Sequence, residues 1–291
     1  DVVYRDAQVG GRKGMGCSTA IHLASAAAAQ ARLENRTLLA YFVDLKSAFY
    51  SCIRTSALPL QGSEADDDLL WIKEHDSVPD ALRPLASFVL AQPAALSELS
   101  SRPHLVSLLV EAHRCTYFTT THAQAFARSR RGSRPGNALA DAVFGLSFVQ
   151  PLSAIADYIK SHDLCADTQP TTRIFSAADL PCDPLTDVEY ADDCLFLALL
   201  RSNDRIVQQS TALCEAVHVA LRSSGFDPNY KRGKSGLMVT VAGPKPTQAR
   251  RAINLRPVHP AAAGAGTDGA PLWPLIRHSS PLQLAGPLPR T

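Results

Sequence analysis

The sequence predicts an α+β fold in which helices pack against an antiparallel sheet. Strand-like and helical segments both recur along the 291 residues, but they do not follow the strict β-α-β alternation of a parallel sheet. Residues 188–200 show a strand-turn-strand pattern, which is typical of an antiparallel hairpin. Hydrophobic residues make up 46% of the chain, so it can bury a substantial core.

The first elements are expected close to the N-terminus. An alanine-rich helix is predicted up to Glu34, with Ser18 or Thr19 as its N-cap. Residues 37–45 (TLLAYFVDL) are apolar almost throughout and therefore predict a central strand. A further helix is expected to begin near Ala48.

The remaining segments follow from periodicity and from turn-forming residues. Residues 61–103 are expected to be less regular, and weak order is expected from Gly243 onward, where Pro, Gly and Ala dominate. The other expected elements are a helix over 105–113, paired strands over 117–121 and 123–127, a basic Gly/Pro loop over 128–137, an apolar helix over 138–160, an amphipathic helix over 206–223, a turn over 225–235, a strand over 236–242 and a short hydrophobic element over 272–284.

Charge and cysteine content narrow the functional class only slightly. The net charge of +2 does not by itself indicate a nucleic-acid binder, so any basic surface must be local. The seven cysteines are scattered without a C-x-x-C pair, which favours a reduced intracellular compartment and leaves nucleus or cytoplasm open. His162 and Cys165 have no second pair at zinc-ligand spacing, so no zinc site is expected.

Targeting signals are not expected in this sequence. It has no uninterrupted apolar run of about 18 residues, and we therefore expect no membrane span. We expect no signal peptide either. The chain starts at Asp1 inside a patterned segment, from which we expect it to be part of a longer protein.

The adjacent carboxylates of Asp192 and Asp193 are the most informative feature for chemistry. They lie between two apolar runs, and Asp44 ends another such run far upstream. Burying like charges is costly unless a cation compensates them. Three carboxylates brought together would form a site for two Mg²⁺ ions, with Mn²⁺ as a substitute, as two-metal phosphoryl transfer requires. The alternative is that the pair is a polar hairpin turn and Asp44 a helix N-cap.

Four segments resemble the motifs of reverse transcriptases, in the right order. Residues 41–50 (YFVDLKSAFY) resemble the first catalytic motif, and residues 190–193 (YADD) resemble the Y-x-D-D box. Residues 131–144 (RGSRPGNALADAVF) are similar to the glycine-rich motif of non-LTR retrotransposons and group II introns, and residues 225–235 (GFDPNYKRGKS) to the fourth motif. The resemblance covers roughly residues 8–240.

This resemblance implies a right-hand polymerase palm, which is a ferredoxin-like antiparallel sheet with packed helices, together with partial fingers and no thumb. The implied organisation is 1–36 partial fingers, 37–60 palm with the first catalytic motif, 61–130 a connection between fingers and palm, 131–242 palm with the template and nucleotide loop, the YADD hairpin and the lysine-containing turn, and 243–291 a low-order tail. Residues 282–286 are a candidate remnant of the primer-grip element.

The resemblance also implies roles for individual residues. Asp44, Asp192 and Asp193 would hold the two metal ions. Lys234 would protonate the departing pyrophosphate, the alternative being a solvated turn lysine. Phe49 would be an aromatic gate that clashes with a 2′-hydroxyl and so favours deoxynucleotides, the alternative being ordinary helix packing.

Basic residues in two glycine-containing loops are candidates for nucleotide or template contacts. Arg12 and Lys13 stand in the loop over 8–18, where glycines allow the backbone to approach phosphates closely. Arg134 and Gly136 belong to the third motif, and Arg131 precedes them. Pro135 replaces the usual glutamine of that motif and Ala140-Asp141 its Ser-Pro, so a hydrogen bond from that glutamine is absent.

The function implied is RNA-directed DNA polymerase, with an RNA template, a primer strand and dNTPs as partners and with no membrane partner. A catalytically inactive relic or nucleic-acid-binding scaffold is the alternative from another class. An RNA-directed RNA polymerase shares the palm, but Phe49 and the Tyr-Ala start of the YADD box disfavour it. The oligomeric state is left open.

Overall fold

The computed structural model describes residues 15–60, 83–98, 102–114, 116–119, 125–129, 131–133, 138–162, 164, 185–231, 233–255 and 277–278. The helices are α1 (Cys17–Leu33), α2 (Ala48–Ser51), α3 (Arg54–Ala57), α5 (Arg83–Ala91), the 3-10 helix η2 (Ala95–Glu98), α6 (Pro103–His113), α7 (Ala138–Ser161), α8 (Ile206–Ser223) and α9 (Pro246–Leu255). The strands are β1 (Thr37–Val43), β2 (Leu45–Lys46), β3 (Tyr117–Phe118), β4 (Ala127–Arg128), β5 (Asp187–Tyr190), β6 (Asp193–Leu200), β7 (Asp227–Pro228), β8 (Gly236–Thr240) and β9 (Arg277–His278).

The main sheet has the strand order β5-β6-β1-β8-β9. The first three pairings are antiparallel, and β9 joins β8 in parallel. The fold class predicted from the sequence, α+β with an antiparallel sheet and packed helices, is confirmed to this extent. The elements β1, α7, β5, β6, α8 and β8 follow one another in the chain as β-α-β-β-α-β, with further elements inserted between β1 and α7 and with β7 between α8 and β8.

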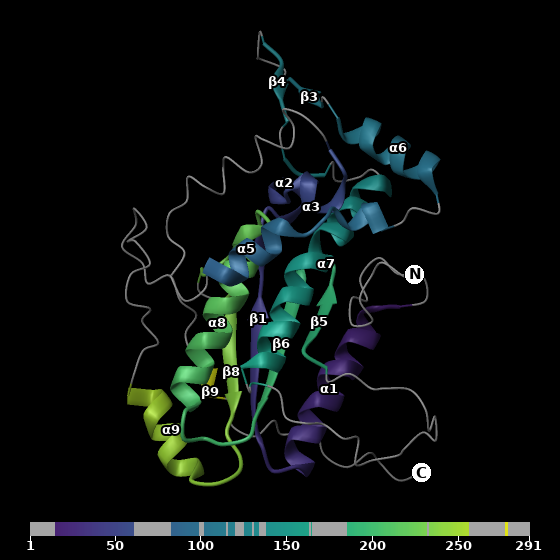
Figure 1. Ribbon diagram of the computed structural model, residues 1–291. Coiled ribbons are helices and arrows are strands. Elements are labelled where there is room, and N and C mark those ends of the chain that lie inside the picture. Colours follow the sequence, from purple (N-terminus) through teal and green to yellow (C-terminus); the bar gives the residue numbers. More distant parts are fainter. Residues whose placement is uncertain are drawn as a thin grey trace, which may run out of the picture.

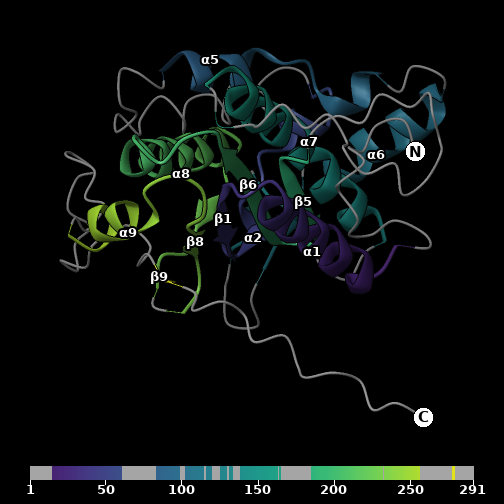
Figure 2. The ribbon, with the colours of Figure 1, turned by 90° about the horizontal axis from the view of Figure 1, so that it is seen from below.

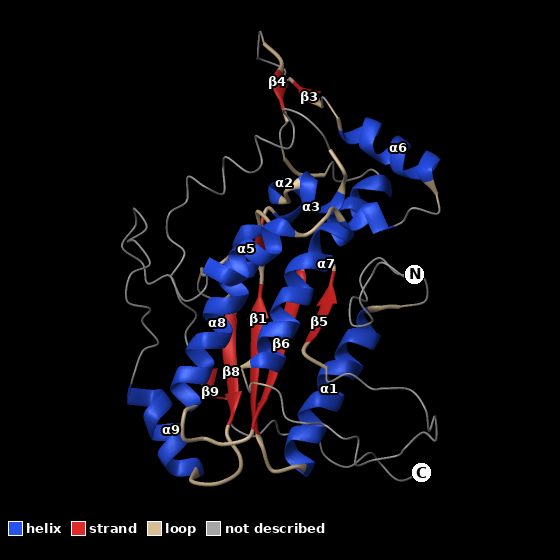
Figure 3. Ribbon diagram, viewed as in Figure 1, coloured by secondary structure: helices blue, strands red, loops and turns tan. Residues whose placement is uncertain are grey.

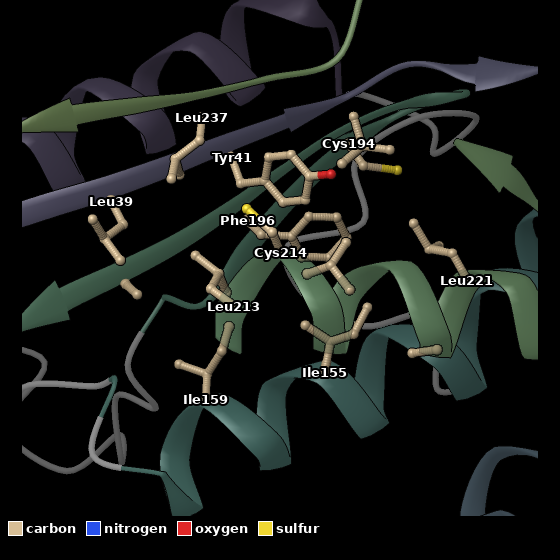
Figure 4. Close-up of a cluster of buried hydrophobic side chains, with 14 of the residues drawn as sticks. Leu39, Tyr41, Ile155, Ile159, Cys194, Phe196, Leu213, Cys214, Leu221 and Leu237 are labelled. Atoms are coloured by element: carbon tan, nitrogen blue, oxygen red, sulfur yellow. The ribbon is translucent and has the colours of Figure 1, made fainter. Parts of the chain in front are cut away.

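Helices cover both faces of this sheet (Figures 1 and 2). Strand β1 alternates its side chains: Leu39 and Tyr41 pack with α7 and α8, whereas Leu38 and Ala40 pack with α1. The buried cluster between sheet and helices includes Phe196 from β6 and side chains of α7 and α8 (Figure 4). Burial on both faces explains why β1 is apolar almost throughout, and the prediction of a central strand is confirmed.

The long helix α7 belongs to this core. Residues Leu139–Ser161 are long and apolar enough to cross a membrane by length and composition, but 67% of the most apolar window is buried within the fold. Among the described helices no other meets that criterion. Its hydrophobicity is accounted for by packing against α3, α5 and α8.

Several element boundaries agree with the sequence prediction and others do not. The predicted N-cap of the first helix is wrong, because Gly16 is the N-cap and Ser18 and Thr19 lie inside α1. The irregular segment predicted over 61–103 contains α5, which buries Val89 against the core. Pairing of residues 117–121 with 123–127 is confirmed only in part, because Tyr117 and Phe118 pair with β4, which includes Arg128.

The weak order predicted from Gly243 onward is also wrong for the start of that region. Helix α9 begins with Pro246, a residue suited to the first helical turn, and buries Ala249 and Ile253 one turn apart. The Pro, Gly and Ala content obscured this amphipathic spacing. Strand β9 lies within the hydrophobic element predicted over 272–284, and the remainder of that element lies outside the described residues, as do residues 282–286.

Candidate active site

The ends of two neighbouring strands bring Asp44 and Asp193 together. Strand β1 ends at Val43, which pairs with Cys194 of β6 in antiparallel register. The residue that follows β1 is Asp44, and the residue preceding Cys194 is Asp193, so the two carboxylates occupy neighbouring positions at one end of the sheet. The end of β1 and the β5–β6 turn lie at this same end (Figure 3).

The β5–β6 turn presents the second pair of carboxylates. Tyr190 pairs with Asp193, leaving Ala191 and Asp192 as a two-residue turn. Ala191 has φ 56°, a left-handed conformation that tightens the turn and is uncommon for a residue with a Cβ atom. Because side chains alternate along a strand, Asp193 shares the face of Leu195, which is the face covered further along by α1.

Like charges crowd Asp193. Loss of contact with water raises the pKa of its carboxyl group, and the neighbouring negative charges of Asp192 and Asp44 raise it further. The ammonium group of Lys234 opposes this by lowering the pKa. A carboxylate surrounded by other carboxylates favours binding of a cation, and this electrostatic pattern is common at functional sites.

Two side chains of the turn before β8 hold the carboxylate of Asp44. The Nδ2 amide of Asn229 donates to Oδ2 at 2.7 Å, and Nζ of Lys234 donates to Oδ1 at 3.3 Å. The backbone is held as well: Asn229 N donates to the Asp44 carbonyl at 2.7 Å, and Asp44 N donates to Oγ of Ser235 at 3.1 Å. Asp44 is therefore linked directly to three residues of the 229–235 turn.

Sequence reasoning selected Lys234 from this turn but assigned no role to Asn229 or Ser235. Both belong to the pattern of the fourth motif, which was the available signal. The sequence prediction of a turn over 225–235 also missed the short strand β7 within it. Lys46 and Asp227 pair across β2 and β7, and Nζ of Lys46 donates to Oδ2 of Asp227 at 3.0 Å. Pro228 is tolerated there because β7 is an edge strand of a two-stranded sheet.

The donor set suits a hard cation, although it is not a preassembled cage. Within the part of the chain that the structure describes, no three His, Cys, Asp or Glu side chains are grouped closely enough to hold a metal ion. Asp44, Asp192 and Asp193 offer only carboxylate oxygens, which are ligands that Mg²⁺ prefers. Both oxygens of Asp44 already accept hydrogen bonds, so its Lys234 contact would have to change for it to ligate a metal through Oδ1.

Phe49 lies on α2, five positions beyond Asp44 in the chain. Its half-buried ring stacks on Phe144 of α7, with ring centroids 4.3 Å apart and planes at 20°. Ser47, with φ 48°, turns the chain from β2 into α2. The packing contact considered from the sequence is thus present, and it fixes the position of the ring relative to the core.

A buried arginine holds the loop in which the third motif begins. Arg54 is 1% exposed. Its guanidinium donates to the carbonyl oxygens of His113 at 2.8 Å, Ser129 at 3.1 Å, Arg131 at 3.0 Å and Gly132 at 2.8 Å. Sequence reasoning did not identify Arg54, because a single arginine after a short helix gives no signal of burial.

The same loop is fastened to α2 and the residue that follows it. Ser133 N donates to the carbonyl of Phe49 at 2.7 Å, and Gly132 N donates to that of Cys52 at 2.9 Å. Gly132 has φ 76°, and a Cβ atom there would lie 2.6 Å from the Cα atom of Tyr50. Only glycine fits this approach without strain.

The other predicted site residues lie outside the described part of the chain. These are Arg12, Lys13, Arg134 and Gly136, together with the substituted Pro135. Cys165, considered with His162 for zinc, lies outside it as well. Comparison with known proteins gave no relative: no protein-family model matches the chain, and no curated protein matches it.

Proposed function

We propose that this chain is the core of an RNA-directed DNA polymerase that adds dNTPs to a primer 3′-hydroxyl. The observation that carries the proposal is the placement of Asp44 beside Asp193. These residues are remote in the chain and meet at adjacent strand ends. Their crowded charges suit a divalent cation better than a packed core.

The topology supports the same proposal. A β-α-β-β-α-β order with the strand order β5-β6-β1-β8 is the ferredoxin-like arrangement that the resemblance to reverse transcriptases implies for a palm. The carboxylates lie directly after its first strand and at its central hairpin. The lysine-containing turn joins its last helix to its last strand. The positions of these three motifs are those that the resemblance implies for a palm, and they support the proposal.

In this proposal Asp44, Asp192 and Asp193 would hold two Mg²⁺ ions once the Lys234 contact to Asp44 is released, because all three offer carboxylate oxygens. When bound, such ions supply activation of the primer hydroxyl and charge neutralisation of the triphosphate. The primer 3′-hydroxyl gives up its proton to water as its oxygen bonds to the α-phosphorus, and the bond from that phosphorus to the oxygen that bridges it to the β-phosphate breaks. Lys234, whose side chain is 52% exposed, donates a proton to the leaving pyrophosphate.

Phe49 is proposed to discriminate against ribonucleotides. Its ring is held by stacking on Phe144, so it cannot make room for an added hydroxyl without disturbing that packing. Phe49→Ala should therefore raise the ratio of rNTP to dNTP incorporation. An RNA-directed RNA polymerase would instead prefer rNTPs before any substitution, so this ratio in the unsubstituted chain separates the two polymerases.

Primer extension on an RNA template tests the proposal. We expect Mg²⁺-dependent dNTP incorporation that falls by at least about a thousandfold in Asp44→Asn and Asp193→Asn. Asp204→Asn is the matched control, since Asp204 pairs with Lys245 beyond the other end of β6. Equal incorporation by all of these proteins would reject the assignment.

The second candidate, a nucleic-acid-binding scaffold, is favoured by Pro135 in place of the expected glutamine. A scaffold should bind RNA without any Mg²⁺-dependent affinity for dNTPs. Measuring dNTP binding with and without Mg²⁺ distinguishes it from a polymerase whose chemical step is slow.

A further inference from the structure

The two oxygens of the Asp44 carboxylate have partners of different kinds. Oδ2 accepts from the amide of Asn229 at 2.7 Å, and Oδ1 accepts from the ammonium of Lys234 at 3.3 Å. The amide partner is neutral and lies close to its oxygen, whereas the ammonium partner is charged and lies farther from its oxygen. The carboxylate itself is only partly accessible, with 27% of its side chain exposed.

Asn229 is held in place by hydrogen bonds of its own. Its N–H donates to the Asp44 carbonyl at 2.7 Å, and its carbonyl accepts from Ser235 N at 3.1 Å. Its side-chain Oδ1 accepts from Lys231 N at 3.3 Å, which orients the amide nitrogen toward Asp44. Next to it, the hydroxyl of Tyr230 bonds Nδ1 of His218 on α8 at 2.7 Å, which anchors the turn to the helix.

Lys234 is held much less firmly. Its side chain is 52% exposed, and the contact to Asp44 is an ion pair that solvent screens. Lysine carries a flexible four-carbon stem, so its ammonium can leave without movement of the backbone. Another cation can therefore readily replace the Lys234 ammonium beside Asp44.

We infer that two residues of the 229–235 turn have different roles toward the Asp44 carboxylate. Asn229 is a positioning residue that holds Oδ2, and Lys234 is a displaceable counter-ion at Oδ1, the oxygen that a divalent cation takes when it binds. Metal binding and the Lys234–Asp44 contact are then mutually exclusive. The inference rests on the proposed function, because it concerns the same metal site.

Because of this exclusion, Lys234 can act as a proton donor only after the metal has bound. While its ammonium neutralises Asp44, it is not available to a leaving group. Arrival of a cation at Oδ1 releases it, so a proton donor becomes free only when the metal is in place. The long distance of 3.3 Å and the exposure of the lysine keep the free-energy cost of this exchange low.

A titration with Mn²⁺, followed by electron paramagnetic resonance without nucleotide, tests the inference apart from activity. Lys234→Met should tighten Mn²⁺ binding about two- to fivefold, since it removes the competing ammonium. Asn229→Ala should weaken binding roughly tenfold, because the amide that orients the Asp44 carboxylate is lost. The two substitutions in one turn thus act in opposite directions.

Lys231→Met is the matched control for charge. Lys231 is an exposed lysine of the same turn, and its substitution changes the net charge by the same amount. A general field effect would tighten Mn²⁺ binding equally in Lys231→Met and Lys234→Met, and that result would overturn the inference. Unchanged binding in Asn229→Ala, with its thermal unfolding also unchanged, would overturn the positioning role.

Two further substitutions, Asp44→Asn and Asp193→Asn, distinguish failure of the Lys234 exchange from failure of the proposed function. If both leave Mn²⁺ binding intact, the proposed metal site is wrong and the inference fails with it. If both abolish binding while Lys234→Met does not tighten it, the metal site stands and only the exchange is rejected.

Discussion

Asp44 and Asp193 occupy neighbouring positions one step beyond the Val43–Cys194 pair of β1 and β6. Strand register therefore sets their proximity, and no mobile loop has to close for them to meet. A shift of one residue in this register would turn one carboxylate to the opposite face. The apolar side chains that β1 and β6 bury on both faces oppose such a shift.

Asp193→Asn should raise thermal stability at neutral pH. The pKa of Asp193 is raised above its usual 3.8, so ionisation of this carboxyl destabilises the fold at neutral pH, and the penalty fades as the pH falls through the raised pKa. Solvent screens this exposed group, and we expect a rise in melting temperature of about 1–2 °C at pH 7. Scanning calorimetry at pH 7 and pH 4 should show the gain shrinking at the lower pH.

Asp204→Asn is the control for the same calorimetric measurement, because the pKa of Asp204 is lowered rather than raised. Hydrogen bonds from Ser202 and Lys245 lower the pKa of Asp204, so its charge is stabilised rather than crowded. No rise in melting temperature is expected on its substitution. Equal gains in both variants would indicate a general charge effect and contradict our account of Asp193.

Gly132→Ala should destabilise the fold by about 3 kcal/mol, since it combines left-handed strain with a backbone clash. The added Cβ atom would lie 2.7 Å from the Phe49 carbonyl oxygen. Gly233→Ala is the control: its φ of 88° is similar, but nothing lies within 4 Å. It should cost only about 1 kcal/mol. Urea denaturation of both variants measures the difference, and equal losses would show that the α2 contact is unimportant.

Arg54→Met should cost at least about 3 kcal/mol of unfolding free energy, because buried carbonyl oxygens lose their donors. Arg54→Lys should recover only part of this, since an ammonium cannot reproduce the guanidinium fork. Arg114→Met, which removes an exposed pair with Glu111, should change stability by less than about 0.5 kcal/mol. A neutral result for Arg54→Met would mean that the loop does not depend on this anchor.

Acid should loosen the turn that holds Asp44. Burial, aided by Arg222, lowers the pKa of His218 to about 4. The neutral ring is thus favoured in the fold, so its contribution is full above pH 6.5 and is lost as the pH falls toward 4. The loss is on the order of 3 kcal/mol. His218→Phe should flatten the stability profile between pH 6.5 and 4, and an unchanged profile would exclude His218 as its cause.

Local patterns predicted the elements that carry the site. Helix α8 was predicted with its observed bounds, and the apolar run before Asp44 gave β1, because both depend on periodicity over many residues. The contacts of Asn229 and Arg54 could not be predicted in this way. Each depends on a hydrogen bond to a residue far away in the chain, and no local pattern encodes such a partner. Helix α9 was missed because its composition concealed the spacing of Ala249 and Ile253.

The most direct measurement of the central claim is backbone cleavage by Fe²⁺ in place of Mg²⁺. Radicals formed by bound Fe²⁺ with ascorbate and peroxide cut the chain beside the metal. We expect cuts next to Asp44 and within residues 190–193, suppressed by excess Mg²⁺ and lost in Asp44→Asn and Asp193→Asn. Cuts elsewhere, or cuts that persist in both variants, would contradict a metal site formed by these carboxylates.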